Sequence, residues 1–523
     1  MTTLPQRTRA FIMAHPLATA LFAGAIARIV AATIALGFFA RDDYFHVLDP
    51  ALRWVADPSF NWDATGLPGA GIRSHLVPRL VWMLVHGCHK LGVTEPDSVL
   101  RVIYLVVGTY SLWVIPGVYL AARRLLDERG VLLATWLAAL HFAMPYAGTR
   151  LLIEAMAMPP LAIGIWLATY RSTARIFAAG LAVGFACWLR YQVGAAAIGL
   201  AIALAIMGYR EAGSREAARR VAALAVGGVL AMLAQGLFDI WTTGDFLGPL
   251  VRNIAINLDP KPGLSRSTPF AYVGVWLLLT VPPATVVTLP AIVRAARKLP
   301  LITWPFVVFV VVHSFIPHKE DRFMLPAMPL FILLAAATPA ALASGRGKPW
   351  ETLRGWWPLT RGVLIGVHVL ALVLACTAQT QANLRDAMID LGRDQELRGL
   401  VSLGPELHTY FLGRDDIPTE QSSKVDAGFL ARALQQIDAH GGNANRFIGF
   451  APDRTKIEIL LAANGLDCGE PRESQGWWVD RLVYRANPKR NRRRSPILIW
   501  KCETPAVARA TGGPNTMAVI GAS

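Results

Sequence analysis

The chain has 523 residues, of which 54% are hydrophobic and only 16% are charged, and its formal net charge is +16. About a quarter of the residues in soluble globular proteins are charged, so this composition excludes an ordinary soluble domain. The positive charge does not indicate nucleic-acid binding, because the arginines are scattered in short loops between long apolar segments, as is typical of membrane proteins.

Apolar segments recur from residue 16 to residue 380, and about eleven of them approach the twenty residues that a membrane-spanning helix needs. The predicted spans are 16–40, 98–121, 130–148, 151–170, 174–189, 193–208, 219–241, 270–293, 299–316, 323–343 and 361–380. Residues 75–92 are also apolar but contain three histidines, an arginine and a lysine, so we expect an amphipathic helix in the membrane interface. The sequence therefore predicts an all-α polytopic membrane protein.

The basic loops predict the orientation of these spans. If the N-terminus faces the cytoplasm, five basic segments also face it, as the positive-inside rule requires. They are 123–130, 171–175, 209–220, 294–298 and 344–361. The polar segments on the outer face are then 41–74, 148–154, 188–192, 242–269 and 318–322. This grouping predicts a functional site at the outer membrane surface.

The composition changes after about residue 380. Residues 1–380 are the predicted transmembrane catalytic domain, in which 41–97 form the first outer loop. Residues 381–505 combine turn signals with short apolar runs and predict a small soluble α/β domain, and 506–523 predict a disordered tail. Cys468 and Cys502 belong to this soluble domain, where an oxidising compartment would permit a disulfide, although both could equally be free.

The first outer loop opens with two adjacent carboxylates, Asp42 and Asp43. A charged helix end at the membrane boundary would explain a single acid, but it explains less well a pair that is followed by aromatic residues and Asp49. Neighbouring carboxylates repel each other, so the pKa of one can rise and that group can serve as a general base. Cations of the other outer segments could hold an anionic leaving group. These cations are Arg150, Arg190, Lys319 and Arg322.

Two longer motifs carry a family resemblance. The stretch DDYFHVLDP…NWD…GIRS is similar to D-E-x-F-x-x-W-E-P, T-W-E and A-I-R-S, and HKEDRFMLP fits H-K-E-x-R-F-x-x-P at each defined position. These patterns are typical of the dolichyl- or polyprenyl-phosphate-mannose-dependent mannosyltransferases (glycosyltransferase family 22), which include enzymes of N-glycan and GPI-anchor assembly. Shorter similarities lie at 148–154 and 238–258. Asp43 in place of Glu, and His46 where Asn or Gln is common, leave the sugar and the acceptor open.

The resemblance implies a GT-C fold, a polyprenyl-phosphate-sugar donor and a lipid-linked or glycan acceptor. With such a donor we expect an inverting displacement in which Asp42 is the general base and Asp43 shares that role or orients the acceptor. The donor-phosphate ligands would be Lys319, Arg322 and His318, with Arg150 and Arg190. The substrate-binding residues would be Glu320, Asp49, Arg73, Tyr191, Gln192 and Asn253. The expected location is a bacterial inner membrane with the site facing the periplasm, or the endoplasmic reticulum in a eukaryote.

Alternatives stay open for these residues and for the function. Lys319 and Arg322 could be snorkelling cations at a helix end, and Arg150 and Arg190 could pair with Glu154 or with backbone carbonyls. Tyr191 and Gln192 could cap a hairpin. No cofactor is predicted, because the histidines are too scattered for a ligand set, although the acidic loop does not exclude a divalent metal. A same-fold enzyme that uses aminoarabinose or glucose is one alternative. A transporter is another, but the charges cluster at one face.

Overall fold

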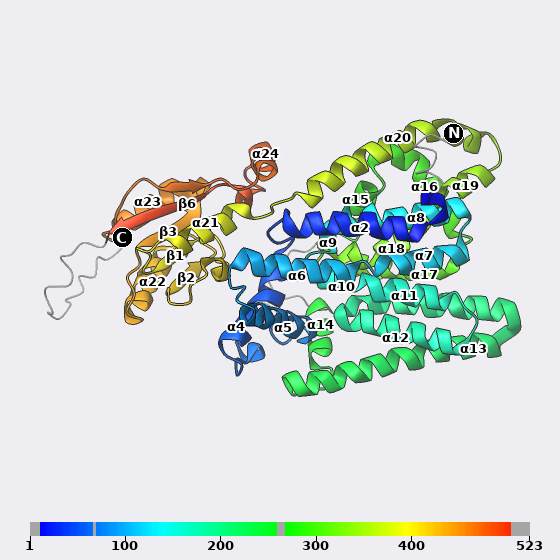
Figure 1. Ribbon diagram of the computed structural model, residues 1–523, viewed down its shortest axis with the longest axis horizontal. Helices are drawn as coiled ribbons and strands as arrows, with labels where there is room; N and C mark the ends of the chain where they lie inside the picture. Colours follow the sequence, from blue (N-terminus) through cyan, green and yellow to red (C-terminus); the bar gives the residue numbers. More distant parts are fainter. Residues whose placement is uncertain (1–10, 66–68, 259–266, 504–523) are drawn as a thin grey trace, which may run out of the picture. The chain divides into compact units, whose positions relative to one another are not determined.

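The computed structural model describes residues 11–65, 69–258 and 267–503. The chain divides into two compact units, Met1–Ala378 and Gln379–Ser523. The first unit is helical, and the second contains a β-sheet covered by helices (Figure 1). The expected disordered tail at 506–523 lies outside the described residues.

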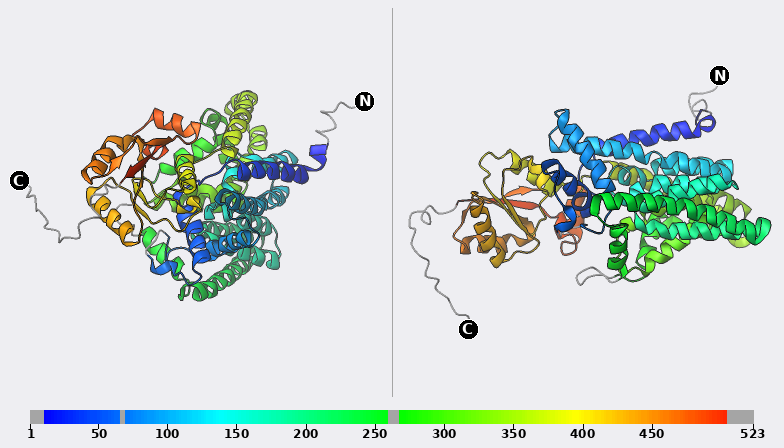
Figure 2. Two further views of the ribbon diagram at one scale, coloured as in Figure 1. Left: turned by 60° about the vertical axis from the view of Figure 1, so that its left-hand side comes forward. Right: turned by 90° about the horizontal axis from the view of Figure 1, so that it is seen from below.

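The first unit is a bundle of helices, many of which run side by side (Figure 2). Its first half contains α2 (Pro16–Thr33), α3 (Arg41–Asp43), the π-helix η1 (Tyr44–Leu48), α4 (Asp49–Ala56), η2 (Trp62–Ala64), α5 (Leu76–Lys90), α6 (Pro96–Ser111), α7 (Val114–Leu125), α8 (Glu128–Leu140), α9 (Ala143–Ala147), α10 (Ile153–Met156) and α11 (Met158–Ala168). Its second half contains α12 (Thr173–Leu189), η3 (Tyr191–Val193), α13 (Gly194–Thr243), α14 (Gly248–Leu258), α15 (Ala271–Leu279), α16 (Pro282–Ala296), α17 (Pro300–Phe315), η4 (Asp321–Ala327), α18 (Met328–Ala336), α19 (Thr338–Ser344) and α20 (Lys348–Cys376).

The structure confirms the prediction that the first unit contains helices able to cross a membrane. Among the described residues, five helical stretches are long and apolar enough to cross a membrane, or up to six if α15 and α16, bent by 96°, form one span. The five are Pro16–Thr33, Pro96–Leu125, Tyr191–Thr243, Asp321–Ser344 and Lys348–Cys376. Helices occupy the other predicted spans too, but several are shorter, so the count of eleven stays a prediction. α5 is a helix at the predicted interfacial segment, and its depth in the membrane also remains a prediction.

Glycines bring α12 and α13 close together. A Cβ atom on Gly180 would overlap the carbonyl oxygen of Leu224, and one on Gly227 would overlap the carbonyl oxygen of Phe177. Small residues allow such backbone approach between membrane helices, where van der Waals packing replaces the hydrophobic effect. α13 itself is two helices, because Ala212 and Gly213 have non-helical backbone angles. The packing matters for the site, because Arg190 directly follows α12.

The second unit is an α/β fold, as predicted. Its strands are β1 (Leu400–Leu403), β2 (Thr419–Ser422), β3 (Arg446–Phe450), β4 (Asp467–Cys468), β5 (Arg472–Ser474) and β6 (Ile497–Glu503). The order is β2-β1-β3-β6-β4; β1, β2 and β3 are parallel, whereas β6 is antiparallel to β3, β4 and β5. The helical elements are α21 (Ala382–Arg393), η5 (Thr409–Leu412), α22 (Ala427–Ala439), η6 (Ala451–Asp453), α23 (Arg454–Ala463), α24 (Trp478–Ala486) and η7 (Arg492–Arg494). Buried side chains such as Leu403, Phe447 and Trp500 form its core.

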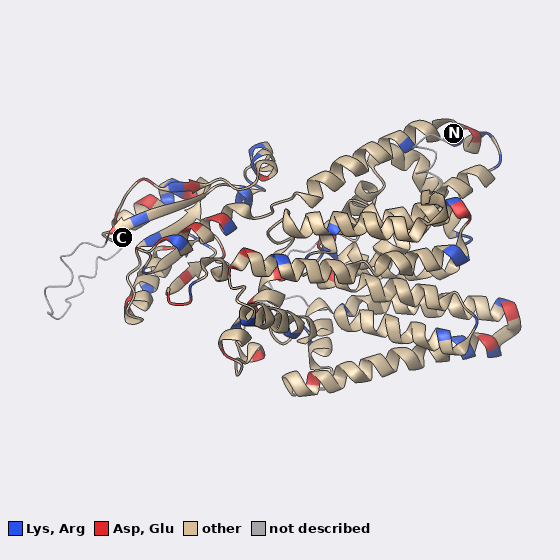
Figure 3. Ribbon diagram, viewed as in Figure 1, with Lys and Arg blue, Asp and Glu red and all other residues tan. Residues whose placement is uncertain are grey.

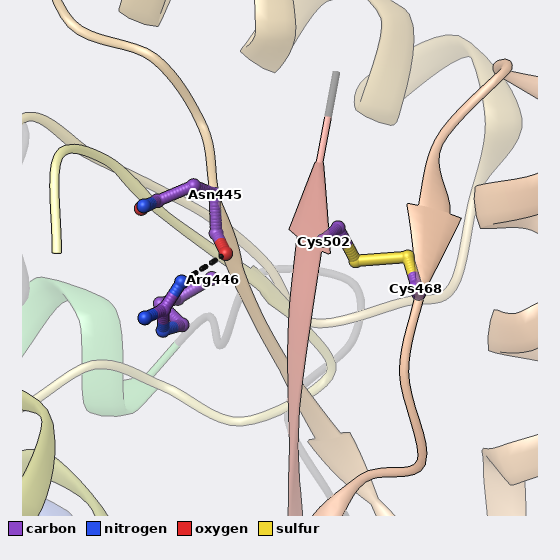
Figure 4. The surroundings of a disulfide bond; sticks show 4 residues. All are labelled: Asn445, Arg446, Cys468 and Cys502. Atoms are coloured by element: carbon purple, nitrogen blue, oxygen red, sulfur yellow. Dashed lines mark hydrogen bonds between the residues drawn. A yellow bond between two sulfur atoms is a disulfide. The ribbon is translucent and has the colours of Figure 1, made fainter. Parts of the chain in front are cut away.

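A disulfide joins two strands of this unit (Figure 4). Cys468 of β4 lies opposite Cys502 of β6 in the antiparallel pairing, and the two sulfur atoms are bonded. Structural disulfides persist in oxidising compartments and are rare in the cytosol.

Candidate functional site

The adjacent acids of the first loop occupy different environments. They lie where α3 passes into the π-helix η1, a distortion that is frequent at functional sites. The Asp43 carboxylate is fully buried and accepts hydrogen bonds from the backbone N–H groups of Phe39 (2.9 Å) and Ala40 (3.3 Å). Asp42 is partly exposed, with 24% of its side chain accessible. Asp43 therefore fixes the turn, while Asp42 can be reached by a ligand.

Three basic side chains surround the Asp42 carboxylate. Arg322 donates to its Oδ2 atom at 2.6 Å, His46 Nδ1 lies 3.1 Å from the same oxygen, and Arg73 Nη2 lies 3.7 Å away. Burial alone would raise the pKa of Asp42, but His46, Arg322 and Arg73 together hold this pKa well below its usual range. Burial raises the pKa of Asp43 to about 7, although Arg322 opposes the shift. Asp42 is thus an ionised carboxylate beside a carboxyl group that titrates near neutrality.

The second motif supplies Arg322 at the start of η4. Arg322 Nε donates to Glu320 at 2.8 Å, and His318 Nε2 lies 3.0 Å from the other oxygen of Glu320. The pKa of Glu320 falls to about 2, because these hydrogen bonds outweigh its burial. The motifs at 42 and 322 are 280 residues apart in the sequence and meet in one ion pair.

A buried acid lies between two arginines of the site. Glu154, from α10, is almost fully buried; Arg190 Nη2 lies 3.3 Å and Arg322 Nε 4.0 Å from its Oε1 atom. Arg190 follows the last residue of α12, and its guanidinium lies over the ring of Phe323. Glu154 therefore holds the guanidinium groups of Arg190 and Arg322 side by side, where both can approach an anionic ligand.

These groups line one cavity. Its polar wall includes Asp42, Asp43, Arg73, Glu154, Arg190 and Arg322, and Trp188 and Tyr191 contribute aromatic surface. Within the described chain, several buried polar atoms of this wall have neither a hydrogen bond nor an ion pair: Asp43 Oδ1, Arg73 Nε, Glu154 Oε2, Arg190 Nη1 and the Tyr191 hydroxyl. Buried polar atoms normally find partners, so such a group of orphaned atoms indicates a binding site for a polar ligand.

Side chains from later segments hold the Ile-Arg-Ser stretch against this cavity. Asn253 donates to the carbonyl of Ile72 at 3.2 Å, and Trp188 donates to Ser74 at 2.9 Å. Ser74 in turn donates to the buried Asp239 at 3.4 Å. Asn253 thus positions Arg73 and does not line the cavity itself.

Several predicted site residues lie outside the cavity. Arg150 is fully buried, donates to the carbonyls of Ala31 and Ala35, and lies over two tyrosine rings. Lys319 donates to the carbonyls of Ser267 (3.2 Å) and Ile316 (2.5 Å), and Asp49 pairs with Arg53 at 3.0 Å. The remaining three are His318, Glu320 and Gln192, none of which lines the cavity. Arg150 thus bonds backbone carbonyls, which is the structural role that the sequence left open beside phosphate binding.

Glu154 and His46 belong to the site but were not predicted as site residues from the sequence. The signal for Glu154 was an acid inside an otherwise apolar segment, which membrane proteins rarely tolerate without a function. The signal for His46 was its spacing, because residues four apart on a helical turn lie on one face, as His46 and Asp42 do. Among the described residues, no group of three or more His, Cys, Asp or Glu side chains could hold a metal ion.

Residues 19–398 match the profile of the Alg9-like mannosyltransferase family. No curated protein gives a significant match. Similar folds include ArnT from Cupriavidus metallidurans bound to undecaprenyl phosphate, with 13% identity, 96% of this chain and 100% of that chain covered, and a TM-score of 0.58. The apo form of ArnT gives 16% identity, 92% and 97% coverage and a TM-score of 0.57.

A second similar fold is archaeal. The oligosaccharyltransferase AglB from Archaeoglobus fulgidus, in complex with an inhibitory peptide and a dolichol-phosphate, shares 11% identity over 85% of this chain and 71% of that chain, with a TM-score of 0.51. At these identities the likeness concerns the fold, which is the GT-C fold of membrane glycosyltransferases.

Proposed function

The chain belongs to the Alg9-like mannosyltransferase family, and on that basis we propose that it transfers mannose from a polyprenyl-phosphate donor to a glycan or lipid-linked acceptor. The observation that carries this proposal is the cavity in which Asp42 faces Arg190 and Arg322. It combines an accessible carboxylate with two arginine side chains, and the Nη1 atom of Arg190 has no partner among the described residues, as a base and a phosphate site require.

The proposed reaction is a single displacement with inversion. The acceptor hydroxyl oxygen attacks the anomeric carbon, and the bond from that carbon to the phosphate oxygen breaks. Asp42 takes the hydroxyl proton, and polyprenyl phosphate leaves with the electron pair of the broken bond. Arg190 and Arg322 stabilise the negative charge that develops on this leaving group. Asp43 orients Asp42 and the acceptor from its buried position.

A lipid-linked donor fits the location of the site. The cavity is built by segments at the ends of apolar helices, where a polyprenyl chain could stay in the bilayer while its phosphate reaches the arginines. ArnT was solved with undecaprenyl phosphate and AglB with a dolichol-phosphate, so two proteins of this fold bind ligands of the proposed class. Mannose follows from the family, whereas aminoarabinose and glucose donors are the alternatives within the same fold.

We further propose that the site and the second unit face the periplasm of a bacterial inner membrane. The disulfide of the second unit suits an oxidising compartment. The basic segments expected at the opposite face also contact each other in pairs. Arg171 lies 3.0 Å from Glu211 of the loop inside α13, and Arg294 donates to Ser344 at 2.8 Å.

Binding of polyprenyl phosphate, the predicted product, tests the phosphate site directly. Arg190→Gln should weaken this binding about tenfold or more in detergent, because a charge-assisted hydrogen bond contributes about 1.5–3 kcal/mol. Arg53→Gln is the matched control: Arg53 belongs to the same loop as Asp42 but pairs with Asp49 outside the cavity. Equal affinities for wild type and Arg190→Gln, measured by microscale thermophoresis, would remove Arg190 from the phosphate site.

A further inference from the structure

Helix α24 of the second unit exposes two large apolar side chains and buries one charged side chain. Asp480 is buried, and its carboxylate accepts a hydrogen bond from Arg494 at 2.8 Å. Trp478 and Leu482, on the opposite side of the helix, are 50% and 54% exposed. A helix on a soluble domain normally turns its apolar face to the core. Trp478 and Leu482 of α24 instead point away from the core, so they form an outward apolar surface on which a partner can bind.

The surroundings of this face are strongly basic. The helix and the loop that follows it are rich in blue, positively charged residues (Figure 3). Between 477 and 496, Asp480 is the sole acidic residue in the sequence. Arg494 pairs with Asp480, and Arg492 pairs with Asp453. Five further cations have no ion pair among the described residues and are exposed or half-buried: Arg481, Arg485, Lys489, Arg490 and Arg493.

Exposed Trp and Leu side chains flanked by unpaired Arg and Lys residues are the composition of helices that lie in a membrane interface. The indole ring and the leucine enter the boundary between headgroups and acyl chains, while the cations bind lipid phosphates. The second unit is also covalently close to a bilayer, because the candidate span α20 ends at Cys376 and α21 begins at Ala382. Such a short tether gives the unit a high effective concentration at the membrane surface.

We infer that the α24 face, defined by Trp478 and Leu482 with the five unpaired cations, binds the anionic phospholipid surface of the membrane that anchors the chain. This contact would hold the second unit against the bilayer. The partner is the lipid surface itself, and the inference does not depend on which sugar the first unit transfers or on whether it transfers one.

The test uses the full-length protein in nanodiscs. The three free cysteines Cys88, Cys187 and Cys376 are replaced by alanine, and an environment-sensitive nitrobenzoxadiazole label is attached at Leu482→Cys. The matched control carries the same label at Gln436→Cys, an exposed position on α22. We expect a blue-shifted emission at 482, quenching by doxyl-labelled phospholipids, and an increase in both when phosphatidylglycerol replaces phosphatidylcholine. The control label should show none of these changes.

Two further measurements distinguish the other occupants of this face. Replacing Arg481, Arg485 and Lys489 together by glutamine should abolish the response to phosphatidylglycerol. Equal quenching at 482 and 436 would overturn the inference. A blue shift at 482 that persists in lipid-free amphipol would also overturn it, because the face would then be covered by protein, either the first unit or a second copy of the chain.

Discussion

Arg322 donates to Asp42 at 2.6 Å and to Glu320 at 2.8 Å, so a bound phosphate must compete with two carboxylates for one guanidinium. If the donor phosphate draws Arg322 away from Asp42, the pKa of Asp42 rises and the carboxylate becomes a better proton acceptor. Donor binding would then prepare the base, and hydrolysis of the donor would be limited before the acceptor arrives.

The pH dependence of kcat/KM distinguishes Asp42 from Asp43 as the base. Asp42 has a strongly lowered pKa and is ionised throughout the neutral and mildly acidic range, so kcat/KM should stay level from about pH 8 to about pH 5. The pKa of Asp43 is raised to about 7, so a base at Asp43 would lose its active form as the pH falls. In that case kcat/KM would fall about tenfold per pH unit below 7. A fall of this kind, absent in Asp43→Asn, would contradict the assignment of Asp42.

The sequence predicted the site best where a motif carried the chemistry. Asp42, Asp43 and Arg322 were identified from their motifs, and the structure brings them into one cavity. Arg150 lies only four residues from Glu154, yet the non-helical segment before α10 separates them, and Arg150 donates to backbone carbonyls instead. Sequence spacing alone does not distinguish these directions. The direction of a side chain depends on where a short helix such as α10 begins, and that is determined by tertiary packing.

At the scale of elements, the packing of α12 against α13 fixes the position of Arg190. Gly180→Val would insert a side chain where the Leu224 carbonyl lies, and we expect loss of thermal stability together with loss of polyprenyl-phosphate binding. Gly274→Val in α15 is the control, because a Cβ atom there meets nothing within 4 Å. Melting curves in detergent measure both variants. A Gly180→Val protein as stable as Gly274→Val would show that this helix contact does not support the site.

The apolar runs of the sequence predicted where the helices lie better than they predicted where a helix bends or breaks. The predicted spans 193–208 and 219–241 lie on either side of the break at Ala212 and Gly213, so these two are separate helices within α13 as predicted. The span predicted at 270–293 is bent by 96° between α15 and α16. Hydropathy averages over about twenty residues, so a break of a few residues inside an apolar run leaves little signal.

For the whole molecule, the proposed orientation rests on the basic loops and can be measured. In a background without free cysteines, single cysteines at Asp57 in the first loop and at Ser214 in the α13 loop report the two faces. We expect a membrane-impermeant maleimide to label the Asp57→Cys protein in intact spheroplasts and the Ser214→Cys protein only after lysis. Gln436→Cys should label as Asp57→Cys does. The reverse pattern would place the Asp42 cavity on the cytoplasmic side and contradict the proposed orientation.

The most direct measurement is transfer of mannose from synthetic polyprenyl-phosphate-mannose to a membrane lipid extract by purified wild type and Asp42→Asn. We predict transfer by the wild type and a loss of about 10²-fold or more in Asp42→Asn, with Asp57→Asn, an exposed acid of the same loop, as the active control. If the wild type transferred sugar solely from another polyprenyl-phosphate sugar, mannose would be the wrong sugar, but the polyprenyl-phosphate donor class would stand. Full activity of a folded Asp42→Asn protein would contradict base catalysis at this loop.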